Sequence, residues 1–152
     1  MAPLIVHLVS YIVIVLMRMF LFPNYKLFKF SLRAESISIG FLFVVAGVAH
    51  FMMATPMVEM IPSFVPFRYE MVYVSGVFEL LSGFALIYGT PYTRTIGAVL
   101  ILFLISSLPI NIYSAVYNVG LGAKGINYLW FRVPLQLFWM FWIWIFLVRK
   151  KY

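Results

Sequence analysis

The sequence predicts an all-α protein that crosses a membrane several times as one compact helix bundle. Hydrophobic residues make up 65% of its 152 residues and charged residues only 10%, whereas a soluble domain is about 45–50% apolar and about 25% charged. The apolar residues form continuous runs that lack the alternation of a membrane β-strand, which excludes a barrel. The absence of cysteine excludes disulfides, thiol redox chemistry and thiolate-bound metal or iron–sulfur centres.

Five apolar runs are long enough to cross a bilayer as α-helices. Each has roughly 19–23 residues, and about 20 helical residues cross a hydrocarbon core of about 30 Å. Turn residues or charges separate the runs, as at Gly89-Thr90-Pro91. We therefore expect a single membrane domain over residues 1–152, with spans at 4–22, 36–54, 71–89, 96–118 and 128–148.

The first run, residues 4–22, has the length of a secretory signal peptide. No basic region precedes it and no small-residue cleavage site follows it, and its positive charge comes after the apolar run. We interpret it as a retained, additional N-terminal transmembrane helix.

The distribution of lysine and arginine predicts the orientation. Seven lie after the first span, after the third span or at the C-terminus, and two lie in the loops of the other side. The seven are Lys26, Lys29, Arg33, Arg94, Arg149, Lys150 and Lys151, and the two are Arg68 and Lys124. The positive-inside rule then predicts an inner (cell) membrane protein with an extracytoplasmic N-terminus and a cytoplasmic C-terminus. Topology therefore explains the net charge of +7 better than nucleic-acid binding does.

Five polar residues inside the apolar runs are the candidate site residues. They are His50 in the second span, Glu79 in the third, Asn111 in the fourth, and Arg132 and Gln136 in the fifth. At 1.5 Å per residue, all five lie about 6–12 Å from the extracytoplasmic boundary. Ionisable groups inside hydrocarbon are costly and indicate a functional site by default. The pattern predicts a ligand-binding or buried polar cluster, identifies no catalytic residue, and favours no metal site.

Each of these residues also has a purely structural interpretation. Glu79 and Arg132 can form a buried ion pair that fixes the helix register. Asn111 and Gln136 are residue types that commonly hydrogen-bond between membrane helices. His50 is close enough to the interface to be solvated.

Small residues and prolines near the polar set predict local packing. Gly76 and Gly83 lie about one turn to either side of Glu79 and permit close approach of a second helix. Pro109 and Pro134 free backbone carbonyls in the fourth and fifth spans. The loop over residues 55–70, TPMVEMIPSFVPFRYE, is strongly apolar and has three prolines. We expect it to lie in the membrane interface, either as a packing hairpin or as a lid over the polar cluster.

Five short motifs occur in an order that resembles the DoxX and DoxX-like membrane proteins. They are AGVAHF in the second span, Val65-Pro66 before the third, SGVFELLSG in the third, LPINIY in the fourth and RVPLQ in the fifth. The resemblance covers about residues 36–148 and implies a four-helix bundle with both its ends in the cytoplasm, so that residues 4–22 are an addition. It also implies a link to respiratory redox, because some relatives are small subunits of thiosulfate:quinone oxidoreductases and others join membrane oxidoreductase assemblies. More distant relatives act in receptor assembly.

Two functions follow as alternatives. In the first, the protein is an accessory or binding subunit of quinone-linked redox machinery, and an extracytoplasmic polar pocket binds a quinone or a lipid-like molecule. In the second, it is a non-catalytic assembly or partner-binding protein whose polar cluster is structural. The lipid bilayer is the expected partner in both, and other membrane subunits are candidates.

Overall fold

The computed structural model describes residues 2–21, 34–122 and 126–149, and all regular secondary structure in these residues is helical. Four segments are long and apolar enough to cross a membrane, and they make this a multi-pass membrane protein. They are α2 (Ala34–Met52), α4 (Arg68–Tyr88), α5 (Thr93–Val116), and Phe131–Arg149, which joins most of α6 (Ile126–Ile143) to the π-helical turn η2 (Trp144–Arg149). The predicted fold class is confirmed.

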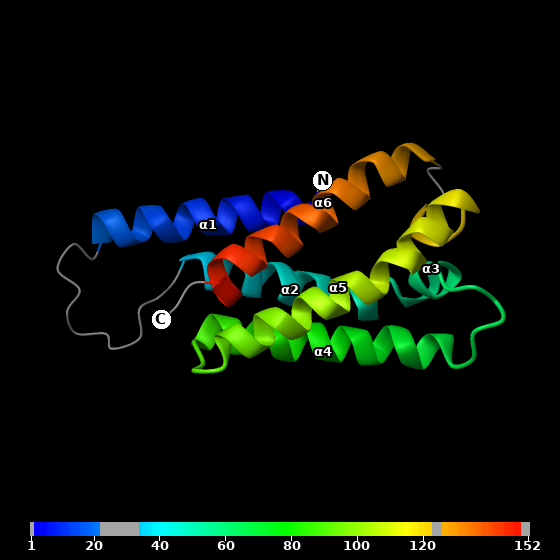
Figure 1. The fold of residues 1–152 in the computed structure, drawn as a ribbon, viewed down its shortest axis with the longest axis horizontal. Coiled ribbons are helices and arrows are strands. Elements are labelled where there is room, and N and C mark those ends of the chain that lie inside the picture. Colours follow the sequence, from blue (N-terminus) through cyan, green and yellow to red (C-terminus); the bar gives the residue numbers. More distant parts are fainter. Residues whose placement is uncertain (1, 22–33, 123–125, 150–152) are drawn as a thin grey trace.

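The first helix, α1 (Ala2–Leu21), is present but displaced along the bundle. It contacts α2, and Figure 1 shows its C-terminal half extending beyond the end of the bundle where α2 begins. His7 packs against Trp142 near the end of α6, so only about five residues of α1 continue toward the middle of the bundle. The sequence predicted an additional N-terminal helix, and its side-chain packing against α6 sets how far that helix is displaced along the bundle.

Glycines bring α2 and α4 into the closest helix contact of the bundle. A Cβ on Gly47 would lie 2.8 Å from the carbonyl oxygen of Gly76, and a Cβ on Gly83 would lie 2.7 Å from that of Gly40. In each helix the two glycines are seven residues apart, a spacing that keeps them on one seam between packed helices. The close approach predicted from Gly76 and Gly83 is confirmed.

The main apolar core lies at the end of the bundle where α4 turns into α5. Its fully buried members come from all four spanning segments, so this cluster joins the four helices. They are Ile39, Leu42, Phe43, Leu86, Leu100, Leu104, Ile143 and Leu147. Figure 1 places the start of α2 and the end of η2 at this same end. Some of the basic residues used to predict the orientation lie outside the described residues. They are the four predicted cytoplasmic lysines, Arg33, and Lys124 of the other side.

The opposite end is covered by a folded cap rather than by an open loop. The cap consists of α3 (Ala54–Glu59), residues 60–67 and the single turn η1 (Gly120–Gly122). Val58 and Ile61 are buried in a second apolar cluster with Val72 of α4. Gly120 has a φ of +55°, and a Cβ there would collide with the Pro56 carbonyl oxygen. The cap therefore packs tightly, as the hairpin interpretation of this apolar loop predicted.

Candidate functional site

The first pair of polar residues lies across the glycine contact between α2 and α4. His50 Nδ1 is 3.2 Å from Glu79 Oε2, and Glu79 is only 6% exposed. A Cβ on Gly76 would lie 2.7 Å from the Cβ of His50, so the absence of a side chain at residue 76 makes room for the histidine. α4 extends further toward the cap than α2 does (Figure 1), which brings these two residues to one level.

The Nδ1 atom of His50 lies close to two oxygen atoms. His50 Nδ1 is 3.0 Å from the Ala46 carbonyl oxygen of its own helix, slightly closer than it is to the carboxylate. One N–H cannot be well aligned with both oxygens. Glu79 Oε2 is fully buried and accepts no hydrogen bond of good geometry within the described residues. The contact is therefore an electrostatic pair in which the carboxylate keeps unused hydrogen-bonding capacity.

Arg132 of α6 brings a positive group toward this carboxylate. Its half-buried guanidinium interacts electrostatically with both Glu79 and His50. The predicted partnership of Glu79 and Arg132 thus exists as an electrostatic interaction. The sequence did not predict that His50 would make the direct contact with the carboxylate.

The second pair of polar residues joins α5 to α6. Asn111 Nδ2 donates to Gln136 Oε1 at 3.2 Å, and Gln136 Nε2 donates to the Leu104 carbonyl oxygen at 2.6 Å and to Ser107 Oγ at 2.9 Å. Gln136 is only 4% exposed. Pro109 has no N–H group to donate to the Ile105 carbonyl. The Gln136 amide bonds to the neighbouring carbonyl, which is that of Leu104. These amides therefore stabilise the part of α5 that the proline weakens.

The five predicted residues gather in one half of the bundle. Arg132 and Gln136 lie one turn apart on α6, which places them on one helix face. Arg132 links α6 electrostatically to the His50–Glu79 pair of α2 and α4. Gln136 links α6 to α5 through its hydrogen bond with Asn111. The arrangement can hold four helices in register.

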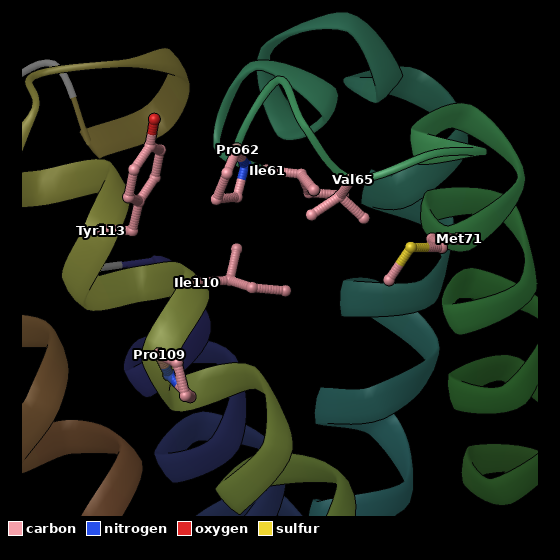
Figure 2. Close-up of a pocket in the computed structure, with 7 residues that line it drawn as sticks. All are labelled: Ile61, Pro62, Val65, Met71, Pro109, Ile110 and Tyr113. Atoms are coloured by element: carbon pink, nitrogen blue, oxygen red, sulfur yellow. The ribbon is translucent and has the colours of Figure 1, made fainter.

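A cavity of about 370 Å³ lies next to this region and has an apolar lining (Figure 2). Its seven lining residues are Ile61, Pro62, Val65, Met71, Pro109, Ile110 and Tyr113. Asn111 is about 100° around α5 from Ile110, and its side chain is bonded to α6 instead. The sequence predicted an opening lined by Glu79, Asn111, Arg132 and Gln136, and this cavity is lined by none of them.

His7 is a buried polar residue to which the sequence assigned no role. Its side chain is 0% exposed and packs edge-on against the rings of Phe138 and Trp142. Neither ring nitrogen has a hydrogen-bond partner of good geometry within the described residues. Tyr11, one turn along, contacts the same tryptophan. The signal in the sequence was the one-turn spacing of these two polar aromatic residues, which places them on one face of the helix.

Among the described residues, no three histidine or acidic side chains lie close enough to hold a metal ion. No curated protein and no solved structure matches the chain. One protein family does match, over residues 39–147, a segment that runs from the first turns of α2 to η2. The chain therefore belongs to the family described as "Domain of unknown function (DUF8561)".

Proposed function

We propose that this protein is a non-catalytic accessory protein of a membrane assembly, and that its polar cluster holds the bundle in register. The observation that carries the proposal is the bonding of Gln136. Its amide is buried and satisfied by Asn111, Ser107 and the Leu104 carbonyl, all within the protein. A site that binds a small molecule usually directs a few polar groups into its cavity, and here these groups bond to one another.

The partners would be other membrane proteins of respiratory redox machinery. The support is the ordered series of motifs that resembles the DoxX-like proteins, which implies association with oxidoreductase subunits. The broad exposed faces of the helices would supply the contacts. Val74, Leu81 and Leu102 illustrate these faces, since each is about two-thirds exposed.

The orientation that goes with this function puts the cap outside an inner (cell) membrane. Arg94 and Arg149 support it, because both lie at the bundle end that would face the cytoplasm. The chain has no cysteine, so Ser63→Cys in the cap and Pro91→Cys in the α4–α5 turn give clean single labelling sites. We expect an impermeant maleimide to label Ser63→Cys in intact cells and Pro91→Cys only after permeabilisation. Labelling of both from one side would contradict this orientation.

Partner association is tested by purification of the tagged chain in mild detergent after cross-linking in the native membrane. We expect oxidoreductase subunits to be recovered in fixed proportion, and the folded fraction of Glu79→Gln to recover them in the same proportion, because in this proposal the cluster stabilises the bundle and does not touch the partner. A variant such as Leu81→Trp, which reshapes an exposed face, should reduce recovery without lowering the unfolding temperature. Recovery of no subunit with the wild-type chain would contradict the proposal.

A second candidate function rests on the unsatisfied oxygen of Glu79. A fully buried carboxylate oxygen without a hydrogen bond, beside His50 and near Arg132, is suited to taking up or releasing a proton. In this alternative the protein binds a quinone and Glu79 handles its protons. Lipid extraction of the purified protein followed by chromatography measures the quinone content. Stoichiometric quinone that is lost in Glu79→Gln and kept in Glu70→Gln would favour this alternative over the first.

A further inference from the structure

The apolar cavity has the position and lining of a site for a hydrocarbon chain. Figure 2 shows Ile61 and Val65 of the cap on one side and Pro109 and Ile110 of α5 on the other, with Met71 of α4 closing one edge. Its volume of about 370 Å³ is within the range of about 300–1,000 Å³ typical of small-molecule sites. The cavity is partly open to its surroundings, so a chain can enter it.

The depth of the cavity matches the outer part of a bilayer leaflet. Met71 is in the first turn of α4, and Pro109 is seven residues from the end of α5, or about 10 Å along the helix. Lipid tails surround a membrane bundle at this depth. A lipid is therefore the molecule that reaches the opening at the highest local concentration.

A cation lies at the outer edge of the same cavity. Arg68, the first residue of α4, donates from Nη1 to the carbonyl oxygen of Ile61 at 3.5 Å, and Ile61 lines the cavity. The guanidinium carries five N–H donors and has no carboxylate partner among the described residues. Glu59 and Glu70, the acidic residues nearest in sequence, are both exposed to the solvent side. Arginine forms strong paired hydrogen bonds with phosphate.

We propose that this cavity binds one acyl chain of an anionic phospholipid, with Arg68 holding the phosphate of its headgroup. The cap then acts as one wall of a lipid site, with the helices α4 and α5 as the other. The site is separate from the polar cluster, and it exists whether or not the protein joins a redox assembly.

Photo-cross-linking with two synthetic lipids tests the proposal. The purified protein in nanodiscs receives phosphatidylglycerol or phosphatidylcholine, each with a diazirine in its acyl chain, and mass spectrometry maps the labelled peptides. We expect labelling concentrated on residues 61–71 and 109–113, with phosphatidylglycerol preferred. Ile110→Trp fills the cavity and should reduce this labelling by at least about fivefold. Ile112→Trp, on the exposed face of α5, is the matched control and should keep it.

The headgroup contact is tested separately. One basic residue near a membrane surface contributes roughly fivefold in affinity for an anionic lipid. Arg68→Gln should therefore remove the preference for phosphatidylglycerol, and Arg94→Gln, at the other end of the bundle, should not. If Ile110→Trp fails to fold, Val65→Phe provides a smaller obstruction from the cap. Equal labelling in the filled and control variants, or protection from unfolding by inorganic phosphate equal to that by the lipid, would overturn the proposal.

Discussion

Gly40 and Gly83 face each other so closely that neither position has room for a methyl group. A Cβ on either residue would lie 2.7 Å from the other's carbonyl oxygen, and a backbone oxygen cannot move away without separating the helices. This contact, repeated at Gly47 and Gly76, sets the distance between α2 and α4. The placement of His50 against Glu79 depends on that distance.

Gly83→Ala should destabilise the protein by about 1–3 kcal/mol, the usual cost of overpacking a tight contact. The unfolding temperature in detergent, followed by circular dichroism, measures the effect. Val77→Ile adds the same single carbon to α4 at an exposed position and should leave the unfolding temperature unchanged. Equal effects of the two variants would show that the glycine contact does not limit the packing.

His50 and Glu79 should be energetically coupled by about 0.5–3 kcal/mol, the range for residues in direct contact. The free energies of unfolding of His50→Gln, Glu79→Gln and the double variant give this value, and the double variant should lose less than the sum. A parallel cycle of His7→Gln with Glu79→Gln is the control. His7 packs on Trp142 near the other end of the bundle, so the second cycle should be additive, and coupling of equal size in both would contradict a direct contact.

Gln136→Leu should destabilise the protein by about 1–3 kcal/mol because it leaves the buried Asn111 amide without its hydrogen-bond acceptor. Adding Asn111→Leu should restore part of this loss. Unfolding in a denaturant series measures both changes. Leu137→Ala alters the exposed side of the same helix and should have a smaller effect. If the double variant is as unstable as the sum of its parts, the two amides are not partners.

The displaced register of α1 predicts a specific cross-link. Tyr11 and Trp142 have ring centroids 5.4 Å apart, so Tyr11→Cys with Trp142→Cys should be joined by a short bismaleimide cross-linker, which spans the space left by the two rings. In a helix that crosses level with the other four, Leu16 would lie near Trp142 instead. The pair Leu16→Cys with Trp142→Cys is therefore the control, and faster cross-linking of this pair would place α1 level with the other four. Gel mobility gives the readout.

The sequence predicted the four spanning helices because each is a long apolar run, and a run of this length has few alternatives in a membrane. It also identified Asn111 and Gln136 as residues that can hydrogen-bond between helices, and the structure shows that they bond to each other. It did not predict that His50 would meet Glu79 directly, because the bounds of an apolar run do not show that α4 extends past the end of α2. The burial of His7 was missed for a similar reason, since helix register depends on packing between side chains that are distant in the sequence.

The closeness of α2 and α4 also bears on how the chain enters the membrane. Synthesis proceeds from the N-terminus, so this hairpin, with its four glycines and the His50–Glu79 pair, leaves the ribosome before α5 and α6 do. The buried carboxylate therefore meets its histidine while the ribosome is still producing the rest of the bundle. Arg132 and Gln136 are synthesised last. They join a hairpin in which the buried Glu79 carboxylate is already in contact with His50.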